Sequence, residues 1–138
     1  MRRNFLRKVG GAYAFGDAIE FNGVDQYVGL VSNFAGLTST ISFWFNSGNV
    51  SIINTFLGGD ATIEYFRLSS STQISVRADG SGGNANFTIP AVSNNTWYHV
   101  FFTTNGTAGR LFLNAVESSS GTVSNGNRAQ DWRFIGQT

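Results

Sequence analysis

Apolar and polar residues alternate along most of this chain, which is the pattern of β-strands with one buried face. In residues 39–48, STISFWFNSG, every second position from Ile41 to Phe45 is Ile or Phe, while Trp44 falls on the opposite face among polar residues. The alternation predicts about ten strands. Besides 39–48, the runs that carry it are residues 18–22, 26–31, 50–56, 62–69, 72–78, 85–89, 96–104, 110–117 and 131–136.

Residues that favour tight turns separate these runs. Examples are Asn22-Gly23, Gly58-Gly59-Asp60 and Asn105-Gly106, and both Gly and Asn tolerate the positive φ that hairpin turns require. No window longer than about ten residues has the 3.6-residue period of an amphipathic helix, so the crossover helices of a parallel sheet are not expected. The pattern predicts an all-β fold, with two antiparallel sheets packed as a jelly-roll sandwich.

The amino-acid composition further limits the classes of protein to which this chain can belong. With 138 residues and 41% hydrophobic residues, the chain can form one packed domain. The absence of Cys excludes a disulfide framework and a thiolate metal site. No apolar run approaches the length of about 20 residues that a membrane-spanning helix needs.

Charge divides the chain into two parts. Arg2, Arg3, Arg7 and Lys8 stand in the first eight residues, whereas the rest holds five basic against eight acidic residues, a net charge of −3. A nucleic-acid-binding face needs clustered Lys and Arg, so contact with nucleic acid or membrane is expected only through the N-terminus. We therefore predict a basic N-terminal arm, residues 1–16, and a jelly-roll domain, residues 17–138.

Four phrases in the sequence match a known pattern in order. They are AIEFNGVDQYVGL (18–30), STISFWFNSG (39–48), NNTWYHVFFTTNGTAGRLFLNAVESSSG (94–121) and FIGQ (134–137). Together they resemble the laminin-G/pentraxin-like branch of the concanavalin A-like jelly rolls. The resemblance implies that fold, but it does not select one function, because the fold carries lectins, adhesion modules, glycosidases and viral surface domains.

The sequence departs from this family pattern at two places. Asn114-Ala115 stands where the pattern has Asn-Gly, and since Ala is strained at positive φ, we expect a different loop there. The sequence stops at Thr138, before the family's acidic loop and final strand. The resemblance thus implies a sheet that lacks its last strand, or one completed by strand addition from the arm or from a neighbouring molecule.

Catalytic residues are not predicted. Glycoside hydrolysis needs two carboxylates facing each other across a cleft, but the carboxylates are scattered, and the nearest pair of interest, Asp60 and Glu64, lies along one strand. The only His, His99, lies within a strand pattern, where we expect it to pack and form local hydrogen bonds. The sequence therefore predicts a protein that is not an enzyme.

No cofactor is predicted either. Pentraxin-like relatives bind calcium, and Asp60 matches one of their ligands, but Ala61 replaces the next ligand and the acidic loop that supplies the others is absent from this sequence. Because Ca²⁺ takes about six to eight oxygen ligands, Asp60 alone cannot hold it. Calcium at this place remains only a minor alternative.

Glycan contact would require exposed aromatic rings beside a few polar groups. Trp44 and Trp97 coincide with family strand positions, so we expect them to be structural. The remaining candidates for ligand-facing aromatics are Tyr13, Phe15 and Trp132.

The N-terminal arm suggests an anchor. RRNFLRK resembles a twin-arginine export motif, but no sufficient apolar region follows it before Asp17. Apolar residues among the charges instead suit an apolar groove with an acidic rim on another protein subunit. The predicted anchor residues are Arg2, Arg3, Phe5, Leu6, Arg7 and Lys8.

Two functional hypotheses remain. The first is a non-enzymatic structural or attachment module of a larger assembly, a phage or viral virion, in which the arm binds further copies of the chain or other virion proteins. The alternative is a lectin-like carbohydrate-binding or adhesion domain, located at the cell surface or outside the cell.

Overall fold

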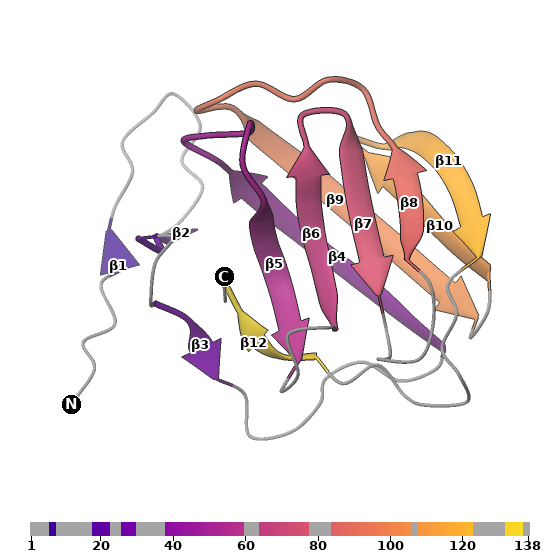
Figure 1. Ribbon diagram of the computed structural model, residues 1–138, viewed down its shortest axis with the longest axis horizontal. Helices are drawn as coiled ribbons and strands as arrows, with labels where there is room; N and C mark the ends of the chain where they lie inside the picture. The colour runs from indigo at the N-terminus through magenta and orange to yellow at the C-terminus, as the bar shows by residue number, and fades with distance from the viewer. Residues whose placement is uncertain are drawn as a thin grey trace.

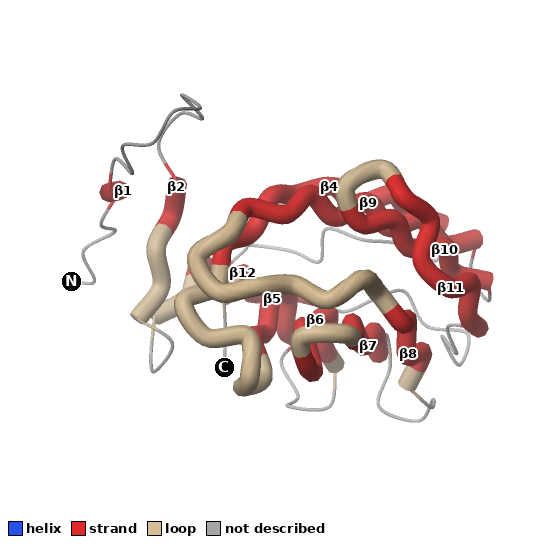
Figure 2. Tube along the Cα trace, turned by 90° about the horizontal axis from the view of Figure 1, so that it is seen from above, coloured by secondary structure: helices blue, strands red, loops and turns tan. Residues whose placement is uncertain are grey.

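The computed structural model describes residues 6–7, 18–22, 26–29, 38–59, 64–77, 84–105, 108–122 and 132–136. Every regular element in these ranges is a β-strand, so the described residues include no helix that could cross a membrane. Two antiparallel sheets form the body of the molecule, and Figure 2 shows them stacked as two layers. The predicted jelly-roll sandwich is thereby confirmed.

One layer is a four-stranded sheet and the other has six strands (Figure 1). In spatial order, the four-stranded sheet contains β11 (Val116–Thr122), β10 (Ala108–Leu113), β9 (Trp97–Asn105) and β4 (Thr38–Asn46). The six-stranded sheet contains β3 (Val28–Gly29), β12 (Trp132–Ile135), β5 (Asn54–Gly59), β6 (Tyr65–Ser70), β7 (Gln73–Arg77) and β8 (Ala85–Thr88). A separate short pair consists of β1 (Leu6–Arg7) and β2 (Ala18–Ile19).

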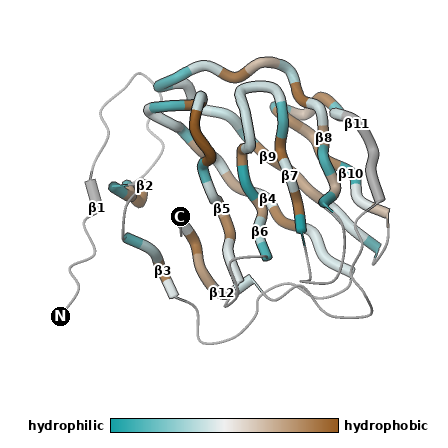
Figure 3. The backbone as a smooth tube through the Cα atoms, in the orientation of Figure 1, coloured by the Kyte–Doolittle hydropathy of each residue, from teal (hydrophilic) through white to brown (hydrophobic). Residues whose placement is uncertain are grey.

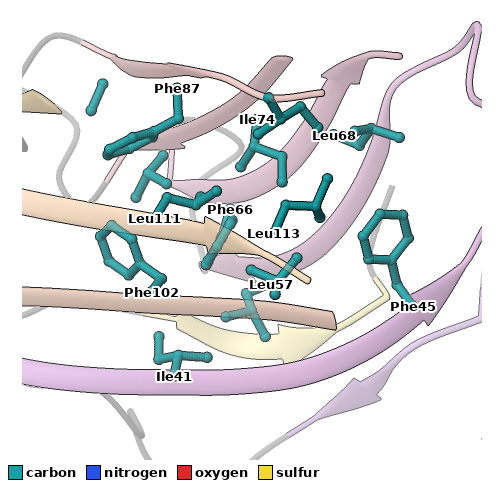
Figure 4. Packing of buried hydrophobic residues seen from close by; sticks show 14 of the residues in the cluster. Ile41, Phe45, Leu57, Phe66, Leu68, Ile74, Phe87, Phe102, Leu111 and Leu113 are labelled. Atoms are coloured by element: carbon teal, nitrogen blue, oxygen red, sulfur yellow. The ribbon is translucent and has the colours of Figure 1, made fainter. Parts of the chain in front are cut away.

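The core lies between the two sheets, where the apolar face of each strand meets the other layer (Figure 4). Phe66 of β6 is fully buried at its centre, with ring centroids 5.6 Å from Phe43 and 5.4 Å from Phe102 of the opposite sheet. Both contacts are edge-to-face, the arrangement that the ring quadrupole favours. The period-two pattern of β4 and β9 therefore produces a core of interlocking rings.

The segment before β5 corrects a predicted strand. Residues 50–53 form a turn, and the strand begins only at Asn54. Hydrogen bonds hold this turn: Ser47 Oγ donates to Asn54 Oδ1 (2.9 Å) and the Val50 amide donates to Asn94 Oδ1 (2.8 Å). The turn exposes Ile52 and Ile53, in the brown stretch leading into β5 in Figure 3.

The run predicted as one strand over 110–117 is a hairpin of β10 and β11. Leu113 pairs with Val116, so Asn114 and Ala115 alone form the turn, with φ of 50° and 65°. This combination is the two-residue turn that matches the twist of a hairpin. The expectation of a different loop at this position is wrong: Ala115 adopts the strained conformation that the family pattern assigns to Gly.

The last described strand does not lie at an edge. β12 lies between β3 and β5 within the six-stranded sheet. In the described part of the arm, Leu6 and Arg7 pair with Ile19 and Ala18 rather than with either sandwich sheet. Nothing in these pairings supports completion of a sheet by the arm.

Candidate functional site

The outer face of the four-stranded sheet carries a group of aromatic side chains. Val100 and Phe102 of β9 are fully buried, so the alternating residues of that strand point away from the core. The strand pairing brings residues of β4 and β10 beside them on the same face. We call this group the aromatic face; it consists of Trp44, Trp97, His99, Phe101 and Phe112.

Trp44 is the most prominent member, since 48% of its surface is exposed. It pairs in register with His99 of the neighbouring strand, and the two ring centroids lie 5.0 Å apart. The His99 ring is itself held in place, because Ser42 Oγ and His99 Nε2 are in hydrogen-bond contact at 2.8 Å. The Trp44 ring is therefore exposed to solvent and supported by an imidazole that is itself held in place.

A second aromatic pair lies further along the same face. Phe101 of β9 and Phe112 of β10 are partners in register, with ring centroids 5.7 Å apart and planes at 72°. The guanidinium carbon of Arg110 lies 5.2 Å from the centre of the Phe112 ring. The aromatic face thus extends across three strands, from Trp44 of β4 to Phe112 of β10.

The charges of this face neutralise each other. Arg110 Nε and Nη2 donate to the two carboxylate oxygens of Glu117, at 2.8 and 2.6 Å. These hydrogen bonds, more than the charge attraction, lower the pKa of Glu117, and the same pair raises the pKa of Arg110. A bidentate pair of this kind leaves little net charge for an ionic ligand.

The hairpin turn anchors the strand that carries His99. The Asn114 amide donates to the His99 carbonyl oxygen, and the His99 amide donates to Asn114 Oδ1, each at 2.9 Å. The Asn114 side chain thus accepts the hydrogen bond that the His99 amide of β9 donates. The position of His99, and through it that of Trp44, depends on the turn.

Hydroxyl and amide groups surround the aromatic rings. Thr40 Oγ1 donates to Thr103 Oγ1 across the two strands (3.3 Å), and Asn46 is exposed opposite Trp97. Aromatic rings beside a few polar groups are the chemistry expected of a surface that binds a polyhydroxylated ligand.

Of the three predicted ligand-facing residues, the structure describes only Trp132. Trp132 is fully buried, with its ring centroid 5.8 Å from that of Phe66, so the prediction that it faces a ligand is wrong. Its large ring belongs to the core between the two sheets. Tyr13 and Phe15 lie outside the described residues.

The predicted anchor residues are only partly described. Leu6 and Arg7 form β1, and the other predicted anchors lie outside the described residues, namely Arg2, Arg3, Phe5 and Lys8. The structure does not bring Leu6 and Arg7 to the aromatic face, because their strand partners are Ile19 and Ala18.

Trp44 is the residue that sequence reasoning missed. It matched a family strand position and was expected to be structural, yet it is half exposed. The signal was present in the alternation, which places Trp44 opposite Phe43 and Phe45. The expectation for His99 is confirmed, because this residue packs and forms local hydrogen bonds.

Metal binding finds no support in the described ranges. No three residues of the types His, Asp and Glu come together there in an arrangement that could hold a metal ion. Asp60, the candidate calcium ligand, lies outside these ranges, as does Ala61.

Comparison with known proteins agrees with this architecture. A laminin G family model, described as the concanavalin A-like lectin/glucanases superfamily, matches residues 22–138. No curated protein sequence matches the chain.

Two solved structures have similar folds. One is domain 4 of AbnA, a GH43 extracellular arabinanase from Geobacillus stearothermophilus, in complex with arabinotriose: the TM-score is 0.55 at 18% identity, over 91% of this chain and 69% of that one. The other is the mouse laminin alpha1 chain, domains LG4-5, with a TM-score of 0.54 at 10% identity over 80% of this chain and 31% of that longer one. At these identities the likeness concerns the fold alone. Because the family model covers well over half of the sequence, the protein belongs to the laminin G family of the concanavalin A-like lectin/glucanases superfamily.

Proposed function

We propose that this protein is a non-catalytic carbohydrate-binding domain that acts outside the cell or at the cell surface, and that its ligand lies on the aromatic face. The observation that carries the proposal is Trp44, which is 48% exposed while its ring is supported by His99. Aromatic side chains that gather on one outer face of a sheet are typical of a surface that binds a partner or a ligand, and Trp44 is the most exposed of this group. The flat ring can stack on the apolar face of a sugar.

The family and one structural neighbour support this choice. The superfamily includes lectins by its description, and domain 4 of AbnA was solved with arabinotriose. That enzyme is extracellular, which agrees with the proposed location. The alternative hypothesis from the sequence is therefore better supported than a virion component, since neither structural neighbour described above is a virion protein.

The chemistry of the aromatic face favours binding over catalysis. Glycoside hydrolysis requires an acid and a second carboxylate on opposite sides of the bond. Among the described residues of the aromatic face and its surroundings on β10 and β11, Glu117 is the only carboxylate, and both its oxygens accept hydrogen bonds from Arg110. We accordingly propose that the domain binds sugar without cleaving it.

The experiment begins with a glycan array and with arabinotriose, followed by calorimetric titration of the best neutral ligand. Trp44→Ala should weaken binding tenfold or more, the order expected for a central tryptophan in a binding surface. Ile52→Ala is the matched control, because Ile52 is 56% exposed but lies on the turn before β5. Binding that Trp44→Ala leaves unchanged, or the absence of any glycan ligand, would contradict the proposal.

The assembly role of the arm stays a separate proposal. It predicts that the basic and apolar residues of 1–16 dock on other copies of the chain or on another protein. Deletion of residues 1–16 should then convert an oligomer to a monomer in analytical ultracentrifugation. A full-length protein that is already monomeric would contradict it, with no consequence for sugar binding by the aromatic face.

A further inference from the structure

The outer face of the six-stranded sheet differs in chemistry from the aromatic face. Phe66 and Leu68 of β6 and Ile74 and Val76 of β7 are fully buried, so the residues that alternate with them point outward. These outward residues are polar, and those of β6, β7 and β8 include no Asp or Glu. They are Tyr65, Arg67, Ser69, Gln73, Ser75, Arg77, Asn86 and Thr88.

Arg67 is held over an aromatic ring at the centre of this face. Its guanidinium carbon lies 3.7 Å from the centre of the Tyr65 ring, within the range of a cation–π contact. Tyr65 is only 7% exposed, and its hydroxyl donates to Asn84 Oδ1 at 2.7 Å. The ring is thus a fixed support for the guanidinium.

Within the described residues, Arg67 differs from Arg110 in its hydrogen bonding. Its Nε is buried and has no hydrogen-bond acceptor, and no ion pair joins it to a carboxylate among the described residues. Arg110 on the opposite sheet shows the contrast, since Glu117 accepts from both its Nε and Nη2. Because the Nε is buried, a ligand would meet the guanidinium through its Nη groups, which are not among the buried unpaired atoms.

The neighbours of Arg67 are small and carry hydroxyl groups. Its partners in register are Thr55 of β5 and Ser75 of β7. Ser75 Oγ donates to Asn86 Oδ1 and accepts a hydrogen bond from Ser69 Oγ, each at 2.7 Å. The backbone of Arg67 is therefore flanked by short polar side chains, while its guanidinium reaches along β6 to the Tyr65 ring.

We propose that Arg67, supported by Tyr65, anchors a second binding site that takes the carboxylate of an acidic sugar. The planar guanidinium fork matches a carboxylate in a bidentate arrangement, in which the two Nη groups each donate to one oxygen. Hydroxyl and amide groups on the neighbouring strands suit the hydroxyls of a sugar ring. This site is independent of the aromatic face, so either proposal can fail alone.

The test is an NMR titration of the full chain with short oligogalacturonides and with their methyl esters, which lack the negative charge. The free acids should bind and the esters should bind at least about tenfold more weakly. Arg67→Gln should weaken binding of the acids by roughly tenfold or more, and Arg67→Lys should restore only part of it, because Lys keeps the charge without the fork. Trp44→Ala, on the opposite face, should have no effect.

Circular dichroism and thermal melting establish that the Arg67 variants remain folded. Equal binding of acids and esters, or binding that Arg67→Gln does not change, would overturn the proposal. Tighter binding of a sulfated neutral oligosaccharide would overturn the assignment to a carboxylate. Arg67-dependent binding of an acidic peptide, without binding of the uronates, would overturn the assignment to a sugar.

Discussion

The two outer faces of the sandwich are built by the same alternation but have opposite surface chemistry. The face of β4, β9 and β10 carries Trp44, His99 and Phe112, and its charged pair is internally neutralised. The face of β6 and β7 carries hydroxyl groups and Arg67, which no carboxylate in the described ranges neutralises. The fold therefore fixes only the inward residues, and the outward residues are free to specify different ligands.

The buried Trp132 and the half-exposed Trp44 should contribute very differently to the stability of the domain. Trp132→Ala should lower the free energy of unfolding by about 3–5 kcal/mol, since it removes a fully buried ring that packs on Phe66. Chemical denaturation measures the loss. Trp44→Ala should lower the free energy of unfolding by less than about 1 kcal/mol, since Trp44 is half exposed and loses only its cross-strand contact with His99. A stability loss of equal size for both would contradict the assignment of one tryptophan to the core and the other to the surface.

Substitution of Asn114 should change the aromatic face but not the outer face of β6 and β7. Asn114→Ala removes the acceptor for the His99 amide and places Ala at φ 50°, so a loss of about 1–2 kcal/mol is expected. Asn114→Gly is the matched control, because Gly tolerates this φ but still lacks the acceptor. NMR shifts should change at His99 and Trp44 in both variants. Comparable changes at Tyr65 and Arg67 would contradict the separation of the faces.

Ala115 offers a smaller change of opposite sign. Ala115→Gly should stabilise the domain by about 0.5–1 kcal/mol, because φ of 65° strains Ala but not Gly. The gain should appear in the unfolding midpoint while the affinity for a neutral sugar stays unchanged. A destabilised variant would show that the β10–β11 turn is not the strained two-residue type.

The smallest expected effect concerns the charged pair of the aromatic face. Hydrogen bonding to Arg110 lowers the pKa of Glu117, so this carboxyl should titrate below the usual range of an exposed glutamate. Any stability that the pair contributes is present above the usual pKa of glutamate and is lost as the pH falls through the lowered value. Carboxyl ¹³C shifts measure the titration, and Arg110→Gln should return it to the usual range. An unshifted titration in the parent protein would contradict the bidentate pair.

Much of the fold could be predicted because period-two alternation reports directly on the buried side of a strand. The inward side of β4 follows from Ile41 and Phe45, both of which are buried. The turn at residues 50–53 could not be predicted in this way, because Asn94, which accepts the Val50 amide, stands far along the sequence. Local apolarity there resembles a strand, although long-range hydrogen bonds make a turn.

The candidate site was harder to predict. Trp132 and Phe134 are two residues apart, so a regular strand would point both to the same side. A register shift between them changes which residues face inward. Ile135 therefore packs against the core, while Phe134 contacts Tyr27. No local sequence pattern predicts such a register shift. Trp44, by contrast, could have been identified as exposed, since its position opposite the core residues of β4 is visible in the sequence.

The central claim is that a neutral sugar lies on the aromatic face. The most direct measurement is chemical-shift mapping of the full chain with the best neutral oligosaccharide from the array. The indole signal of Trp44 and the ring signals of His99 and Phe112 should show the largest shifts, while Tyr65 and Arg67 stay unchanged. Shifts concentrated around Tyr65 and Arg67, or on the turn at Ile52, would contradict the account.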